Sequence, residues 1–486
     1  MRSFALISVI VLVLASGPGV ASAAGPTTEV GRIGDANFVI DMPSSWNGTL
    51  LVYSHGYREP SSDPSCTPSN PALWAQCNPG QDAGDELTRQ SLLSQGFALA
   101  GSGYSTMGWA VASALGDQSS PGDQIALMDH FAAEHGHPSR SIAWGHSLGG
   151  MVTAGLVQRH PDRFAGALPM CGVLAGGIAT WNIGLDGEFI FKTLLAPSSN
   201  LQLVHIADPS ANLTTAESIL AQAQATPSGR ARIALIAAMA DTPGWFAPLS
   251  PEPASTDYNA REQNQFEWDS QVDFPFLFAL RADLEAKASG NPSWNTRVNY
   301  RQLLERSINR DEVLALYSTA GLSLEDDLAT LQKSDRIAAD PAAVDYLTRF
   351  ISYNGDIDIP LLSMHTIGDG LVIPQDEEAY ADVVRPHADT TRLRQVFVHR
   401  AGHCAFTPAE TIAALQALIA RVNTGAWDAI TSPGTLNARA LGLGPMLNVF
   451  GSGQTLIPTA PAFVPFSPSE FPRPFDVRND QDHDAR

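Results

Sequence analysis

Short apolar runs alternate with amphipathic stretches along residues 24–173. The runs are short enough for buried strands, and the apolar positions of the stretches recur with the period of a helix. The pattern predicts two short strands within residues 28–43, strands at 48–54, 97–101, 141–144 and 165–170, helices at 86–94 and 123–135, and a helix ending near His160. Strands and helices that alternate at this spacing are typical of βαβ units. We therefore predict an α/β fold with a mostly parallel sheet and helices on both faces.

The alternation stops at residue 174 and resumes near residue 360. Residues 174–355 contain long helix-periodic stretches, which predict a large and mainly helical insertion. Strands are expected again at 360–364 and 395–398, followed by a helix at 409–422. The predicted organisation is a core in two parts (24–173 and 356–430), the cap insertion at 174–355 and a Pro- and Gly-rich C-terminal arm at 431–486. The arm lacks clear periodicity, and its apolar residues predict an extended segment packed on the body.

The first 23 residues have the pattern of a secretory signal peptide. Arg2 precedes a short apolar run, Pro18 interrupts it, and the small residues Ala21 to Ala23 form a cleavage site. The run is too short to span a bilayer, and no other segment is long and apolar enough to do so. We expect cleavage before Ala24 and an extracellular or periplasmic protein without a stable membrane anchor.

Composition limits the classes of partner. The 486 residues include 50 acidic and 29 basic side chains, which gives a formal charge of −21. A chain this acidic repels phosphate backbones, so no nucleic-acid partner is expected. Hydrophobic residues make up 44% of the chain, enough for a large core.

Four cysteines in an exported chain favour two disulfides. Cys66 and Cys77 lie in one Pro-, Ser- and Asn-rich loop, so a local bridge is the first expectation. Cys171 and Cys404 would then pair, and both are expected at the carboxyl edge of the sheet. The spacing of the cysteines predicts no zinc site.

The sequence Gly145-His-Ser147-Leu-Gly149 contains the pattern G-x-S-x-G. It follows a predicted strand and opens a predicted helix, which is the context of a nucleophile elbow. A serine on such a turn stands clear of the sheet at a helix N-terminus, where negative charge is favoured. Ser147 is therefore the candidate nucleophile.

A serine nucleophile needs a base and an acid that orients the base. Asp369 lies just past the strand predicted at 360–364, and His403 lies in the loop after the next strand. Asp356 and Asp358 precede the first of these strands, at its wrong end, and Asp376 lies beyond Pro374. We therefore choose Asp369 over these three acids.

These segments resemble the α/β-hydrolase superfamily. The resemblance covers about half of the chain and is carried by Gly-His-Ser-Leu-Gly-Gly, Gly-Asp-x-x-Val-x-Pro and Gly-His. It implies that Ser147 is the nucleophile, that His403 is the general base and then acid, and that Asp369 fixes the imidazole. A His-Gly turn at His55 also fits the superfamily, and it implies backbone N–H donors from Tyr57 and Leu148 for an oxyanion hole.

A narrower resemblance concerns Cys404. Tannases and feruloyl esterases are similar in placing a cysteine directly after the histidine and bridging it near the serine. This chain has His146, and not a cysteine, before Ser147. We take this similarity as a structural hint for a bridge from Cys404 to Cys171.

Other histidines receive structural interpretations. His130, His135 and His137 cluster with Glu134 at the end of one predicted helix, but their spacing matches no zinc-protease motif. We expect no metal and no organic cofactor.

The predicted activity is that of a secreted serine hydrolase. We expect it to cleave carboxylic ester bonds of a small molecule through an acyl-enzyme, and the apolar cap suggests a hydrophobic acyl or aryl part. An amidase or peptidase could use the same triad, and an acyltransferase would pass the acyl group to an alcohol instead of water. The sequence does not separate these alternatives.

Overall fold

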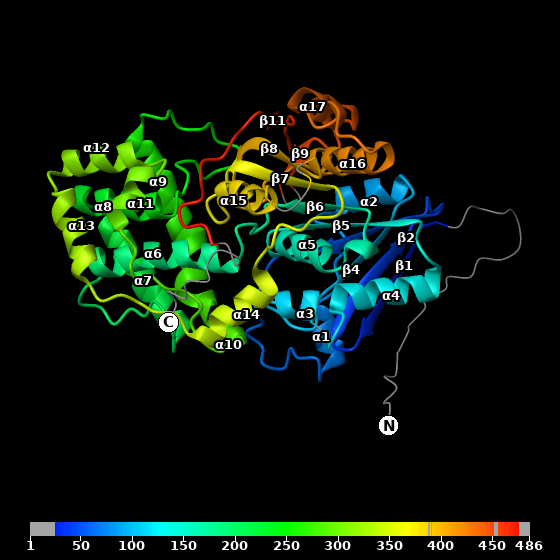
Figure 1. The fold of residues 1–486 in the computed structure, drawn as a ribbon, viewed down its shortest axis with the longest axis horizontal. Helices are drawn as coiled ribbons and strands as arrows, with labels where there is room; N and C mark the ends of the chain where they lie inside the picture. Colours follow the sequence, from blue (N-terminus) through cyan, green and yellow to red (C-terminus); the bar gives the residue numbers. More distant parts are fainter. Residues whose placement is uncertain (1–24, 118, 387–388, 390, 452–454, 476–486) are drawn as a thin grey trace, which may run out of the picture.

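The computed structural model describes residues 25–117, 119–386, 389, 391–451 and 455–475 (Figure 1). A sheet flanked by helices forms one part of the molecule, and a group of helices beside it forms a cap. The signal peptide predicted at 1–23 lies outside the described residues.

The main sheet has nine strands in the order β1-β2-β4-β3-β5-β6-β7-β8-β11. Strands β4, β3, β5, β6, β7 and β8 are parallel neighbours, whereas β1, β2 and β11 pair antiparallel at the two edges. The strands are β1 (Thr27–Ile33), β2 (Ala36–Met42), β3 (Thr49–Ser54), β4 (Ala98–Ser102), β5 (Arg140–His146), β6 (Gly166–Met170), β7 (Leu361–Gly368), β8 (Leu393–Ala401) and β11 (Phe463–Val464); β9 (Val449–Phe450) and β10 (Ile457–Pro458) form a separate pair. The α/β-hydrolase fold expected from the sequence is confirmed.

Helices cover both faces of the sheet because successive strand residues point to opposite sides. On β3, Leu50 and Val52 pack in one apolar cluster with helices α4 and α5, whereas Leu51 and Tyr53 pack in another with α2 and α16. Both faces of this strand are therefore buried, which explains its continuous apolar run. The core helices are α1 (Pro71–Cys77), α2 (Glu86–Ser94), α3 (Val111–Leu115), α4 (Asp123–His135), α5 (Leu148–Arg159), α15 (Gln375–Val384), α16 (Pro408–Thr424) and α17 (Pro433–Gly442), with a 3₁₀ turn η1 (Pro161–Arg163).

The cap is inserted between β6 and β7, as the sequence predicts. It has its own apolar cluster, in which α6, α7, α8 and α12 contribute buried side chains. The cap elements are α6 (Gly177–Leu195), α7 (Pro209–Gln224), α8 (Pro227–Met239), α9 (Tyr258–Trp268), the π-helical segments η2 (Asp269–Asp273) and η3 (Phe276–Leu280), α10 (Arg281–Ala288), α11 (Tyr300–Arg306), α12 (Arg310–Ala320), α13 (Leu324–Lys333) and α14 (Pro341–Ile351).

The C-terminal arm differs in part from the expectation. Helix α17 lies within the segment that was expected to lack helical structure, and it begins with Ser432 as N-cap and Pro433 in the first turn. Further on, β11 adds a strand to the sheet edge, and Arg473 reaches into the cap, where it donates to Asp186 at 2.8 Å. The arm therefore joins the sheet to the cap.

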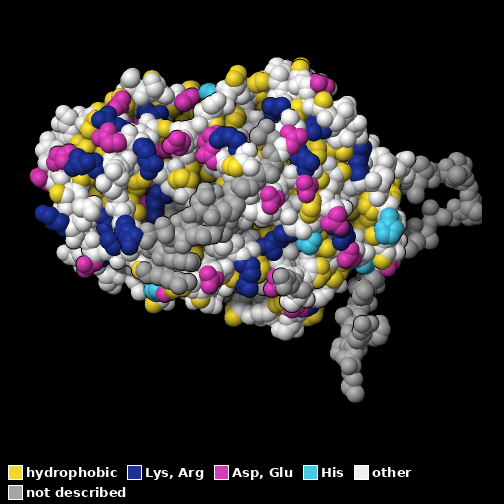
Figure 2. Space-filling model, viewed as in Figure 1, with side chains coloured by type: hydrophobic (Ala, Val, Ile, Leu, Met, Phe, Trp, Pro, Cys, Tyr) yellow, Lys and Arg dark blue, Asp and Glu magenta, His cyan; other side chains and the backbone are white. Residues whose placement is uncertain are grey.

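Acidic and basic side chains are interspersed over the face shown in Figure 2. Among the described helices, none has the length and apolar character needed to cross a bilayer.

Candidate active site

Ser147 occupies a tight turn between β5 and α5. Its φ is 58° and its ψ is −124°, a conformation that side chains rarely adopt. The turn is held by the Ser147 N–H, which donates to the Met170 carbonyl of β6 at 3.0 Å. Helix α5 starts at the next residue, so the serine lies at its N-terminus.

The two motif glycines are required by close backbone approach. A Cβ at Gly149 would lie 1.9 Å from the Ser54 carbonyl oxygen, and a Cβ at Gly145 would lie 2.5 Å from the same atom. Any side chain at either position would push the turn away from β3. The G-x-S-x-G spacing thus has a steric reason in this chain.

Asp369 and His403 meet at the same edge of the sheet. Asp369 follows β7, is fully buried, and accepts a 2.8 Å hydrogen bond from His403 Nδ1 through Oδ2. Its other oxygen accepts from the N–H groups of Leu371 and Val372, both at 3.1 Å. These contacts fix the carboxylate and leave His403 Nε2 as the nitrogen that can accept a proton.

The loop that carries His403 is tied to the end of β7. The Gly402 N–H donates to the Gly368 carbonyl at 3.0 Å, and the Thr366 hydroxyl donates to the Gly402 carbonyl at 2.8 Å. A register shift between Thr366 and Gly368 interrupts the β7–β8 ladder just before Asp369. Such irregularities redirect side chains at sheet edges.

A second histidine, His365, contacts Asp369 from within the core. Its Nε2 lies 3.5 Å from Asp369 Oδ2 and donates to the Val372 carbonyl at 2.8 Å, while Nδ1 lies 3.2 Å from Glu377 Oε1. Burial alone would lower the pKa of His365, but its hydrogen bonds and the charges of Asp369 and Glu377 outweigh this and raise the pKa to about 10. These contacts therefore favour the protonated form of the buried His365 imidazole.

The two histidines keep Asp369 ionised. Burial would raise the pKa of this carboxyl, but its hydrogen bonds and electrostatic interactions with His403 and His365 hold the pKa below its ordinary value. His365 was not identified as a site residue from the sequence. Its position four residues before Asp369 is the one signal that could have indicated it.

Glu377 completes this cluster. It accepts hydrogen bonds from the Ser363 hydroxyl and from Gln395 Nε2, the latter at 2.7 Å. The acids and histidines at the sheet edge (Asp369, Glu377, His365 and His403) form one connected group, which we name the edge cluster.

The structure contains the disulfides Cys66–Cys77 and Cys171–Cys404. Cys171 follows β6, so its bridge to Cys404 links the loop of His403 to the strand beside Ser147. His403 Nε2 lies 3.4 Å from Cys404 Sγ, and within the described residues no hydrogen bond joins it to the Ser147 hydroxyl. Serine–histidine contacts are often long in a free enzyme and tighten when substrate binds.

A mainly apolar pocket opens on Ser147. Its walls come from the sheet edge and from the cap, and include Tyr57, Trp109, Ser147, Leu148, Val173, Thr180, Trp181, Ile183, Ile236, Asp269, Asp273, Phe274, Phe276, Leu277, Leu371, Val372 and Ile373. The two residues expected to supply oxyanion N–H groups, Tyr57 and Leu148, are among them. Within the described chain neither backbone N–H donates a hydrogen bond, so both are available to a ligand.

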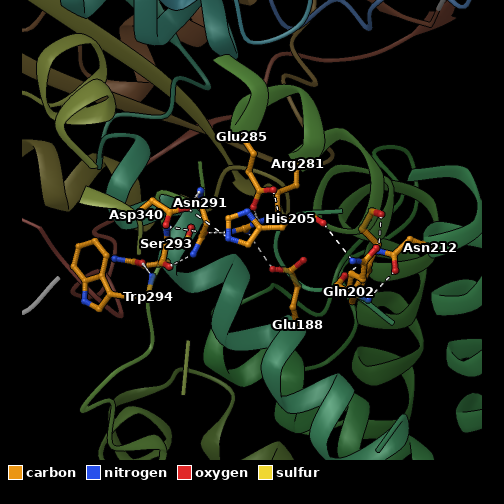
Figure 3. Close-up of polar contacts among 12 residues, drawn as sticks. Glu188, Gln202, His205, Asn212, Arg281, Glu285, Asn291, Ser293, Trp294 and Asp340 are labelled. Carbon is orange, nitrogen blue, oxygen red and sulfur yellow. Dashed lines mark hydrogen bonds and ion pairs between the residues drawn. The ribbon is translucent and has the colours of Figure 1, made fainter. Parts of the chain in front are cut away.

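A buried arginine cluster lies behind one wall of this pocket. Arg281 is fully buried and donates to Glu188 at 3.3 Å, to Glu285 at 3.1 Å and to Asn291 at 2.8 Å (Figure 3). Its guanidinium carbon lies 5.4 Å from the ring centre of Trp181, which lines the pocket. The Arg281 guanidinium thus packs against the Trp181 ring and supports it.

The carboxyl group of Glu188 is only partly stabilised by the other residues of this arginine cluster. Burial raises its pKa to about 8, although the charge of Arg281 opposes the shift. One of its oxygens, Oε1, has no hydrogen-bond partner. From the sequence, Trp181 is one of several tryptophans of the insertion that could line a pocket or pack in the core, and no motif marks the residues that support it.

The acids that were rejected as triad members lie elsewhere. Asp358 is exposed and pairs with Arg392 at 2.9 Å, and Asp356 accepts from Asn354 at 3.1 Å. Asp376 is buried, accepts from the Ala175 N–H at 2.9 Å, and has its pKa raised to about 7 by burial.

The remaining histidines have structural contacts. His146 accepts from or donates to the Tyr53 hydroxyl at 3.1 Å, and burial lowers its pKa to about 4. His130 and His135 both bond to Glu29 of β1 at 2.8 Å. Among the described residues one group has metal-ligand spacing, Cys171, His403 and Cys404, and its two sulfurs are already in a disulfide.

Two sequence comparisons relate this chain to known proteins. Residues 90–176, which include Ser147, match the model of the prolyl oligopeptidase family. An o-phthalyl amidase from Xanthobacter agilis is 28% identical over 446 residues, which is 85% of this chain and 91% of that protein.

Solved structures with a similar chain course are more distant. Feruloyl esterase B from Aspergillus oryzae is 14% identical with a TM-score of 0.36, and the match covers 82% of this chain and 80% of that one. An esterase from Aspergillus oryzae is 12% identical with a TM-score of 0.38, over 90% and 86% of the two chains.

Proposed function

We propose that this chain, a serine hydrolase of the α/β-hydrolase superfamily, cleaves a carboxylic amide bond through an acyl-enzyme and also turns over activated esters of the same acid. The observation that carries the proposal is the position of Ser147 on its strained turn, at the mouth of the pocket and at the sheet edge that holds Asp369 and His403. The amide preference is supported by the similarity to the o-phthalyl amidase over most of both chains. An ester preference, expected from the sequence, is the second candidate.

The reaction divides into two transfers. The Ser147 hydroxyl oxygen attacks the carbonyl carbon while His403 Nε2 takes its proton, and the N–H groups of Tyr57 and Leu148 hold the oxyanion. His403 then returns the proton to the leaving amine or alcohol as the scissile bond breaks. A water molecule, deprotonated by His403, releases the acid and restores the serine.

The pocket favours an aromatic or otherwise apolar acyl group. Trp109, Trp181, Phe274 and Phe276 supply rings to its walls. We place the enzyme outside the cytoplasm, because its disulfides require an oxidising compartment.

The decisive experiment combines labelling with turnover. A fluorophosphonate should label Ser147 in the mature protein, and Ser147→Ala should lower turnover of both benzoyl p-nitroanilide and benzoyl p-nitrophenyl ester by about 10⁴-fold or more. Ser94→Ala, at the end of α2, is the control and should leave both rates unchanged.

The outcomes separate the alternatives. Turnover by Ser147→Ala with an unchanged circular dichroism spectrum would remove Ser147 as nucleophile. Hydrolysis of the ester without the anilide would replace the amidase proposal by the esterase.

A further inference from the structure

Two acidic side chains lie in the substrate pocket. Asp269 and Asp273 begin and end the π-helical segment η2, and both line the pocket that Ser147 lines. Single π-helical turns are frequent at functional sites. The mechanism proposed above gives these two carboxyl groups no task.

Neither carboxyl group has a cationic partner in the part of the chain that the structure describes. Asp269 is 4% exposed, and its Oδ2 has no hydrogen-bond partner. In the described chain no hydrogen bond or ion pair reaches the Asp273 carboxyl group either. The neighbouring Glu262 adds negative charge. Arg230 forms an ion pair with Glu262 at 2.7 Å and does not pair with Asp269 or Asp273.

The electrostatic environment is unfavourable for two negative charges. Burial raises the pKa of Asp269 well above its ordinary value, and the charge of Glu262 adds to the effect. The pKa of Asp273 is raised by burial and by the charges of Asp269 and Asp369. Removing an unpaired carboxylate from water is unfavourable unless a cation joins it.

We infer that Asp269 and Asp273 bind a cationic nitrogen of the substrate, at the end away from the scissile carbonyl. The substrate class is an apolar or aromatic acid derivative that ends in a protonated amine or amidine. This inference rests on the proposed function, because the pocket is taken as the place where the acyl group binds.

Three observations favour a cation over an anion. The pocket-lining residues of the described chain include no Lys, Arg or His. The formal charge of −21 draws cations toward the protein. Trp109 and Trp181 also line the pocket, and aromatic rings can attract an ammonium or amidinium group that enters it.

The first test measures selectivity. Three p-nitrophenyl esters with equally long acyl chains should be compared, ending in an ammonium, a methyl and a carboxylate group. We expect kcat/KM for the ammonium ester to exceed that for the methyl ester by about 10- to 100-fold, the value of one or two charge-assisted hydrogen bonds. The carboxylate ester should be the poorest substrate.

Substitutions of the two acids test whether they cause the preference for the ammonium ester. Asp273→Asn should reduce the ammonium-to-methyl ratio of kcat/KM to about 1, and Asp269→Asn should reduce it in the same direction. Glu267→Gln, on helix α9 and outside the pocket lining, is the matched control and should keep the ratio. Equal kcat/KM for the ammonium and methyl esters in the unmodified enzyme would overturn the inference. A preference for the carboxylate ester would also overturn it and would indicate protonated acids that donate to an anion.

The second test does not need catalysis. Calorimetry on the Ser147→Ala protein should show n-hexylammonium binding about tenfold or more tighter than n-hexanol, and Asp273→Asn should remove the difference. If the ammonium binds but no ester or amide is hydrolysed, the proposed function fails while the cation site stands. If esters are hydrolysed but the two ligands bind alike, the cation site fails alone.

Discussion

The edge cluster and the pair Asp269–Asp273 place acids around the same serine in opposite ways; Asp369 and Asp269 are buried, and Asp273 is half-buried. In the edge cluster, Asp369 has two histidines and two backbone N–H groups as partners. In the cap, Asp269 and Asp273 have no cationic partner in the described chain. A fully paired buried charge fixes geometry, whereas an unpaired acid is suited to bind a charge from outside.

The largest effect is expected at Asp369. Asp369→Asn keeps the shape but removes the charge that orients His403, so kcat should fall by about 10⁴-fold. The free energy of unfolding should also fall by about 3 kcal/mol, because His365 loses a partner inside the core. Turnover and urea unfolding measure the two effects.

Asp356→Asn is the matched control for this change, since Asp356 is an exposed acid near the start of the same strand. It should alter neither quantity. A loss of kcat below tenfold in Asp369→Asn would mean that another acid orients His403.

A smaller effect is expected at His365. His365→Gln retains a hydrogen-bond donor but removes the positive charge beside Asp369, so His403 binds its proton more easily. The acid limb of the kcat/KM profile should move to higher pH by about one unit. His399→Gln, a half-exposed histidine of β8, should leave the profile in place. An unchanged profile in His365→Gln would limit His365 to packing.

The smallest expected effect is on the free energy of unfolding, and its sign differs between the two regions. Asp273→Asn should stabilise the protein at pH 8, whereas Asp369→Asn should destabilise it. Because the pKa of Asp273 is raised by folding, its carboxyl group destabilises the protein increasingly as pH rises above about 4, the value in the unfolded chain. Asp273→Asn should therefore raise the free energy of unfolding by about 1 kcal/mol at pH 8 and change it little at pH 4. Denaturant titration at the two pH values tests this, and a loss of stability at pH 8 would show that the cap compensates the acid.

The features of the site that depend on residues close together in the sequence could be predicted. Ser147 lies between a strand and a helix that are recognisable from local periodicity, and Asp369 and His403 each follow a parallel strand. Because the carboxyl ends of parallel strands meet at one edge, their convergence could be expected from topology alone.

Features that depend on long-range packing could not be predicted. Glu377 becomes a partner of His365 only when α15 packs beside β7, and Asp269 becomes part of the pocket only when the cap folds over the sheet edge. Helix α17 is a different case, since Ser432 and Pro433 form a recognisable helix start that the surrounding prolines and glycines obscured.

The bridge from Cys171 to Cys404 has a consequence for the chain as a whole. The two cysteines are 233 positions apart in sequence, and the entire cap lies between them. A protease that cut any exposed loop of the cap would produce two fragments still held in a single covalent molecule. After one such cut, Ser147 on one fragment and Asp369 and His403 on the other would therefore remain in the same molecule.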